Sequence, residues 1–157
     1  GLRGKTSVVN EEKCIGCSEC TVTCPTRAIK ISWKSEPEAL QEKMVEFAEG
    51  ALKNKKGKCG FITFLTNISP QCDCYGWSDA PLVRDIGILA SRDPVALDQA
   101  SVDLVNGESV LPNNSLEGKE KAGDKFRTLY PSVDWTRQLV YAEEIGLGTR
   151  SYELVKV

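Results

Sequence analysis

The sequence predicts an α/β fold, with α+β as the alternative, built as a small sheet with flanking helices and preceded by a cysteine-rich loop. Two observations support this prediction. Between residues 37 and 107, apolar runs typical of strands alternate with helical periodicity. Four of the seven cysteines lie within residues 14–24, outside that alternating region. We therefore expect two domains, a loop segment at 1–34 and an α/β domain at 35–157.

The first third of the chain contains signals for two short strands and a helix. Residues 5–9 and 28–33 carry β-branched or alternating apolar side chains, so we expect a strand at each. Residues 35–38 read Ser-Glu-Pro-Glu, a capping box with proline near the first helical position. The helix that follows carries apolar residues at three-and-four spacing, which we expect to face the core. These are Leu40, Met44, Phe47, Ala48, Ala51 and Leu52.

Two strands and a second long helix are predicted next. Residues 61–68 and 85–90 are nearly continuous apolar runs, the pattern of strands buried on both faces. Asp93 should cap a helix that starts at Pro94 and stops at 106–107, Asn-Gly. One face of this helix carries Leu97, Ala100, Ser101, Leu104 and Val105.

The last third is less regular. Residues 107–121 are polar and rich in turn formers, which predicts a surface loop. Short helices are expected at 122–129 and 135–145, from their apolar spacing. Residues 151–157 alternate like a final strand.

The amino-acid composition argues against several classes of function. Hydrophobic residues make up 41% and charged residues 27% of the 157 residues, so the chain can bury a core. A formal charge of −2 argues against nucleic acid or an anionic membrane as partner. No apolar run reaches the ~20 residues of a membrane span, and we expect no signal peptide. Histidine is absent, which excludes histidine-based triads, zinc ligands and proton shuttles.

A compact run of four cysteines is the strongest functional signal. They are Cys14, Cys17, Cys20 and Cys24. Their spacing, with Pro25 directly after the last, is that of the bacterial ferredoxin run that binds a 4Fe–4S cluster. Cysteines at every third position let a tight loop present thiolates to one cubane. The intervening Gly16 and Ser18 are small, so backbone N–H groups can approach the cluster sulfides.

Two alternatives concern this cluster. Four thiolates also suit a structural zinc ion, although zinc sites usually use two separated cysteine pairs. In ferredoxins with two clusters, the cysteine before proline ligates the second cluster, and this chain has no second run. Either Cys24 completes its own cluster, or a remote cysteine does, from the set Cys59, Cys72 and Cys74.

The three remaining cysteines suggest a second metal site. In an extended segment, Cys72 and Cys74 would point to the same side. Cys59 comes just before the strand predicted at 61–68 and could supply a third sulfur. The alternative is that Cys59 is a small buried hydrophobe and that the pair has no ligand. An odd, clustered set of seven cysteines favours a reducing compartment, the cytoplasm, over a disulfide scaffold.

The loops after the two predicted buried strands could converge on one crevice beyond the carboxyl ends of the strands. That crevice would gather Cys72, Asp73, Cys74, Asp79, Arg84, Ser91, Arg92 and Asp93. Simpler roles compete with this reading. Asp93 can be a helix cap, Asp79 and Arg84 can be solvated loop charges, and Tyr75 and Trp77 can cover the loop.

Several stretches resemble the uncharacterised family of Fe–S-centre proteins classed as domain of unknown function 362. They are the cysteine run at 14–25 and residues 67–83, 85–106 and 141–157. The resemblance implies an α/β domain with a ferredoxin-like insert, in a bacterial or archaeal cytoplasm. Family members look longer at the N-terminus and often carry two cysteine runs, which implies that this chain is a C-terminal fragment. The resemblance names no substrate.

Three functional hypotheses follow. The first is electron transfer, in which one 4Fe–4S cluster relays single electrons to a redox partner protein. The second is a metal-dependent redox enzyme with a reactive site at Cys72 and Cys74. The third is a structural cluster in a binding module. We expect the first, with neither nucleic acid nor membrane as partner, and whether the chain is an enzyme stays open.

Overall fold

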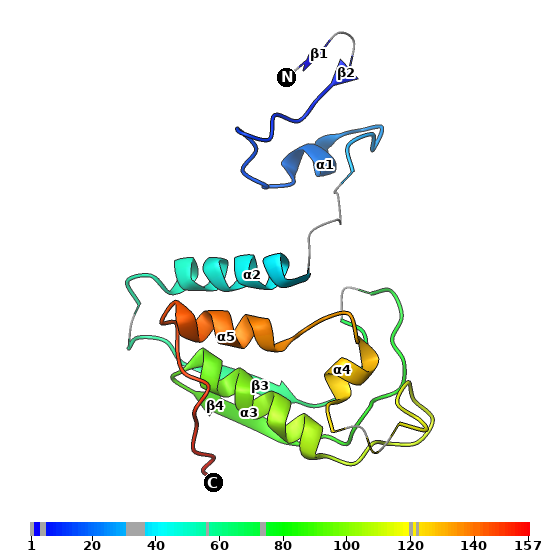
Figure 1. The fold of residues 1–157 in the computed structure, drawn as a ribbon, viewed down its shortest axis with the longest axis vertical. Coiled ribbons are helices and arrows are strands. Elements are labelled where there is room, and N and C mark those ends of the chain that lie inside the picture. The colour runs from blue at the N-terminus through cyan, green and yellow to red at the C-terminus, as the bar shows by residue number, and fades with distance from the viewer. Residues whose placement is uncertain are drawn as a thin grey trace. The chain divides into compact units, whose positions relative to one another are not determined.

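The chain divides into two compact units, Gly1–Ser35 and Glu36–Val157, which are treated separately below (Figure 1). The computed structural model describes residues 2–3, 6–30, 37–55, 57–72, 75–119, 121 and 123–157. Its mixture of helices and a small sheet confirms the predicted α/β or α+β class. None of the helices in these ranges is both long enough and apolar enough to cross a membrane.

The first unit has little regular structure. Strand β1, Leu2–Arg3, pairs antiparallel with β2, Thr6–Ser7, and a short helix α1 covers Glu19–Thr23. Of the strand expected at 5–9, Thr6–Ser7 is part of a strand, Val8 and Val9 are not, and Lys5 lies outside the described residues. Of the strand expected at 28–33, residues 28–30 are irregular and the rest lie outside the described residues.

The second unit contains a two-stranded antiparallel sheet. Strand β3, Phe61–Leu65, pairs with β4, Gly87–Ser91, so that Phe61 lies opposite Ser91 and Leu65 opposite Gly87. The two strands predicted from the apolar runs therefore form, but they are not buried on both faces. Helix α3 packs on one face. The other carries Ile62, Phe64 and Ile88, each about two-thirds exposed (65%, 64% and 64%), because none of the described elements of the second unit covers it.

Helix α3, Pro94–Gly107, forms as predicted. The Oδ1 atom of Asp93 accepts the N–H groups of Val95 and Ala96 at 2.9 and 3.0 Å, which confirms Asp93 as its cap. The inward face of the helix joins β3 in the larger core, whose buried members are Leu65, Leu82, Val83, Val105 and Leu116. Leu116 is fully buried, so the loop expected at 107–121 is not all on the surface.

Helix α2, Pro37–Leu52, buries a different face from the one predicted. It packs against α5, Thr136–Glu144, and its buried residues are Gln41 and Val45. Leu40, Met44 and Phe47, which should have faced a core, are 51%, 53% and 81% exposed. Ion pairing as well as apolar packing favours this face of α2, because the acidic side of the helix faces α5. There the guanidinium of Arg137 pairs with Glu42 and also lies over the Tyr141 ring.

Among the predictions for the last third of the chain, the two helices are confirmed and the final strand is wrong. The helices expected near 122–129 and 135–145 form as α4, Lys125–Leu129, and α5. The strand expected at 151–157 does not form, and those residues are exposed. An alternating sequence becomes a strand only when a neighbouring edge supplies hydrogen-bond partners, and none of the described strands pairs with it.

Candidate metal centre

The four cysteines of the run lie on one loop shaped by a turn and by α1. The N–H of Cys14 donates to the carbonyl of Asn10 at 2.9 Å and closes the turn before the run. Cys20 lies within α1, and Cys24 is the residue that ends that helix. The four thiols are close together in the sequence. Because α1 spans only five residues, the backbone changes direction between them.

Gly16 and Ser18 provide two of those changes of direction. Both adopt the left-handed region, with φ of 71° and 59°. Glycine enters this region without steric cost, whereas serine does so rarely. No atom lies within 4 Å of a Cβ built on Gly16. The backbone beside the cysteines is therefore open.

Cys24 is the thiol whose ionisation the loop favours. The Thr26 hydroxyl lies 3.5 Å from its sulfur and, with the backbone N–H groups of Ile29 and Ala28, lowers the pKa of Cys24 from 9.0 to about 7. The thiolate is the form that ligates metals. The loop thus favours the thiolate form of Cys24 without any metal.

The donor set fits a group with four thiolate ligands, although the thiols do not converge. Within the described ranges, no three cysteine, aspartate or glutamate side chains lie close enough together to hold a metal ion. Cys14, Cys17 and Cys20 are exposed free thiols. None of residues 8–30 is buried, so a ligand could draw the thiols together without disrupting a core. Four soft sulfur donors suit a 4Fe–4S cluster, and they also suit zinc.

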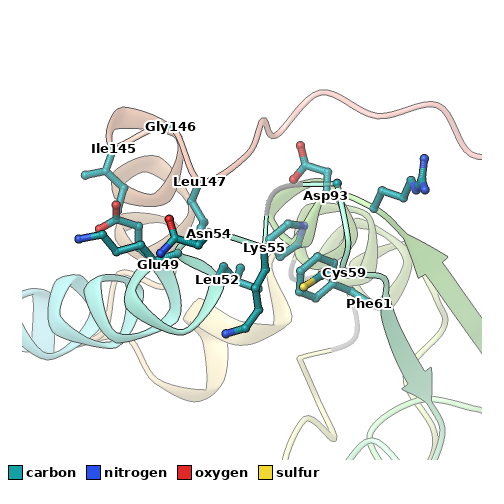
Figure 2. A pocket seen from close by; sticks show the side chains of 14 residues that line it. Glu49, Leu52, Asn54, Lys55, Cys59, Phe61, Asp93, Ile145, Gly146 and Leu147 are labelled. Atoms are coloured by element: carbon teal, nitrogen blue, oxygen red, sulfur yellow. The ribbon is translucent and has the colours of Figure 1, made fainter.

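Cys59 lies apart from the loop that carries Cys72. Cys59 is half-buried in the wall of a cavity of about 500 Å³, where Figure 2 shows it beside Phe61. This cavity opens between the end of α2, the start of β3 and the start of α3. Its labelled lining residues include Leu52, Asn54, Lys55, Asp93 and Leu147.

Cys72 lines a separate cavity of about 460 Å³ together with aromatic side chains. Tyr75 and Trp77 meet edge to face with ring centroids 6.0 Å apart, and the Tyr130 hydroxyl donates to the carbonyl of Pro70 at 2.6 Å. Tyr75 and Trp77 belong to the loop itself, and Tyr130 contacts it from the end of α4. Asp73 and Cys74 lie outside the described residues, so the Cys72–Cys74 pair stays a prediction.

The expected crevice at the strand ends is wrong, because β3 and β4 are antiparallel. Carboxyl ends meet at one edge only when strands are parallel. Here Leu65 ends β3 opposite the start of β4, and Ser91 ends β4 opposite the start of β3. The segments that follow the two strands therefore leave from opposite ends of the sheet.

Three of the charged residues assigned to that crevice, Asp79, Arg84 and Asp93, have structural partners. Asp79 accepts the Ser115 hydroxyl and the Ala80 N–H, and the Ser115 bond is the main reason that its pKa is lowered. Arg84 donates through Nε and Nη2 to the two carboxylate oxygens of Glu108, at 2.7 and 3.0 Å. Together with the helix cap Asp93, they hold loops and helix ends.

One polar residue at a cavity was missed from the sequence. Asp98 on α3 lines two neighbouring cavities beside β3, and desolvation raises the pKa of its carboxyl group. Its position could have been noticed, because helical spacing places Asp98 on the same side as Val95, Ser101 and Val105, which are apolar or small.

The comparisons with known proteins identify a family and nothing more specific. The model for the family described as "Domain of unknown function (DUF362)" matches residues 13–103, more than half of the chain. The chain therefore belongs to the DUF362 family. Searches of curated proteins and of solved structures each gave no match.

Proposed function

We propose that this member of the DUF362 family binds one 4Fe–4S cluster and transfers single electrons to a redox partner protein. The ligands would be Cys14, Cys17, Cys20 and Cys24. The observation that carries the proposal is this quartet, spaced as in bacterial ferredoxins and followed by Pro25. The matched family segment includes the whole quartet.

The loop's own groups have definite roles in this proposal. When bound, such a cluster supplies one-electron chemistry at a potential within about −700 to +450 mV, which the protein adjusts. The N–H groups of Ala28 and Ile29 and the hydroxyl of Thr26 favour negative charge on the sulfur of Cys24. Donors to ligand sulfur stabilise the more negative, reduced form and raise the potential.

The surface of the loop supports electron transfer to another protein. Cys14, Cys17 and Cys20 are exposed, so their thiolates are accessible from outside. Two apolar side chains on the same loop, Ile15 and Val22, are 86% and 84% exposed. Exposed apolar side chains beside a redox centre provide contact area for a partner protein.

Metal and sulfide content test the binding proposal. After anaerobic reconstitution, we expect about four irons and four acid-labile sulfides per chain, the content of one cubane. Cys14→Ser or Cys17→Ser should abolish this content. Cys59→Ser makes the same chemical change outside the loop and should leave it intact. Zinc without sulfide would overturn the proposal.

The fourth ligand needs its own comparison. Cys24→Ser should lower the iron content as strongly as Cys14→Ser does. If Cys24→Ser keeps a full cluster and a variant of Cys59, Cys72 or Cys74 loses it, then a remote cysteine completes the site.

Reversible reduction separates electron transfer from a purely structural cluster. Reduction with dithionite should give an EPR signal that disappears on reoxidation with the iron content unchanged. A cluster that cannot be reduced, or that breaks down on reduction, would leave the structural role and remove the electron-transfer role.

A further inference from the structure

Strand β3 has an edge that lacks the usual protection against pairing. Its one neighbour among the described strands is β4, on the other edge. Natural edge strands commonly carry lysine, proline or a bulge that prevents association. Residues 61–65, Phe-Ile-Thr-Phe-Leu, contain no charge and no proline. An edge of this composition is typical of a strand that is paired or covered in the assembled protein.

Apolar side chains on neighbouring elements are also uncovered. On α2, Leu40, Met44 and Phe47 lie along one side at four- and three-residue spacing and are 51–81% exposed. On the sheet, Ile62, Phe64 and Ile88 occupy the face away from α3. Both sets belong to the second unit.

A groove joins the two sets into one surface. It measures about 560 Å³ and lies between Ala48 and Ala51 of α2 and the first three residues of β3. Ala51 continues the exposed apolar side of α2, and Ile62 belongs to the uncovered face of the sheet. Here "docking surface" means Leu40, Met44, Phe47, Ala51, Ile62, Phe64 and Ile88.

The size of the docking surface matches that of a dimer interface. At roughly 200 Å² for each large apolar side chain, the exposed fractions amount to about 750 Å². This exceeds the ~300–600 Å² of the largest apolar patch on a typical monomer. It is close to the ~800 Å² that each partner buries in a standard interface.

We infer that the docking surface binds a second copy of this chain. A two-fold axis through the docking surface would set the uncovered face of the sheet and the apolar side of α2 against a second copy. Such an interface is isologous, so each copy covers the apolar side chains and the free β3 edge of the other. The inference concerns the second unit and does not depend on the proposed cluster.

Sedimentation velocity of the full chain, under anaerobic reducing conditions that prevent intermolecular disulfides, tests the inference. Wild type should sediment as a dimer of the 17.2-kDa chain. Phe47→Lys and Ile62→Lys should each raise the dimer dissociation constant at least about 100-fold, because a buried lysine lacks a partner there. Val155→Lys alters a residue that is 70% exposed outside the docking surface, and it should change nothing.

Hydrogen exchange of the wild type keeps the test valid if a variant fails to fold. The β3 amides should exchange more slowly at concentrations where the dimer forms than after dilution. Three results would overturn the inference: a wild type that stays monomeric at about 100 µM, a ladder of species larger than the dimer, or equal weakening by Val155→Lys.

Discussion

At the scale of single residues, the loop controls the protonation of Cys24 through four donors, the hydroxyl of Thr26 and the backbone N–H groups of Ile29, Ala28 and Thr26. The Thr26 hydroxyl contributes most, ahead of the N–H groups of Ile29 and Ala28. A thiol whose pKa is lowered on folding stabilises the folded loop fully above about pH 9.0, its unperturbed pKa. That contribution is lost as the pH falls through about 7, the folded pKa.

Thr26→Val removes the strongest donor and keeps the side-chain shape. The pKa of Cys24 in the metal-free chain should rise from about 7 toward 9.0. Iodoacetamide alkylation across a pH series, followed by mass spectrometry of the Cys24 peptide, measures the midpoint. Thr23→Val is the matched control, because the Thr23 hydroxyl donates to the carbonyl of Glu19 and not to a sulfur. An unchanged midpoint in Thr26→Val would mean that the backbone N–H groups alone set the pKa.

At the scale of elements, Asp93 joins α3 to the C-terminal segment. Its Oδ1 accepts N–H groups of the first turn of α3, and its Oδ2 accepts the Thr149 N–H at 2.9 Å. A Cβ added to Gly148 would lie only 2.1 Å from Asp93 Oδ1. Glycine at 148 therefore allows one carboxylate to hold both segments.

Gly148→Ala should displace the Asp93 side chain and lower the free energy of unfolding by about 1–3 kcal/mol, the usual cost of overpacking. Urea unfolding followed by the helical circular-dichroism signal measures the loss. Gly50→Ala, within α2, is the control because nothing lies within 4 Å of its added Cβ. That change should stabilise by up to ~1 kcal/mol, from helix propensity. Equal effects of the two substitutions would show that Asp93 tolerates the clash.

Local signals predicted the elements better than their surroundings. The Asp93-Pro94 start of α3 was readable from the sequence, since a cap acts within one turn. The buried face of α2 was not, because periodicity locates an apolar stripe without saying what covers it. The same limit applies to β3, because an apolar run does not show whether one face or both faces of a strand are buried.

The candidate site divides in the same way. Cysteine spacing is a property of the sequence, so the quartet could be identified directly. The donors that favour the Cys24 thiolate depend on how residues 26–29 fold back, which no spacing rule describes. The prediction of a crevice was wrong because strand direction depends on topology. The sequence does not show that β4 runs antiparallel to β3.

At the scale of the whole molecule, the two units differ in what stabilises them. The second unit holds two hydrophobic clusters, one around Leu65 and Val105 and the other around Val45 and Leu139. In the first unit, none of residues 8–30 is buried. A segment without a core needs a ligand or a covalent link to hold one conformation.

Metal removal should therefore act on the two units unequally. When a chelator removes the proposed cluster, amides within residues 8–30 should exchange at least about 10-fold faster, because binding free energy is folding free energy for such a segment. Amides of β3 and α3 should keep their protection, since their core contains no metal ligand of the quartet. Hydrogen exchange of the iron-loaded and iron-free chains, resolved by peptide, measures both. Cys59→Ser, loaded and stripped in parallel, should show the same contrast. Equal loss of protection in α3 would mean that the second unit also depends on the metal, and then its two apolar clusters alone would not account for its stability.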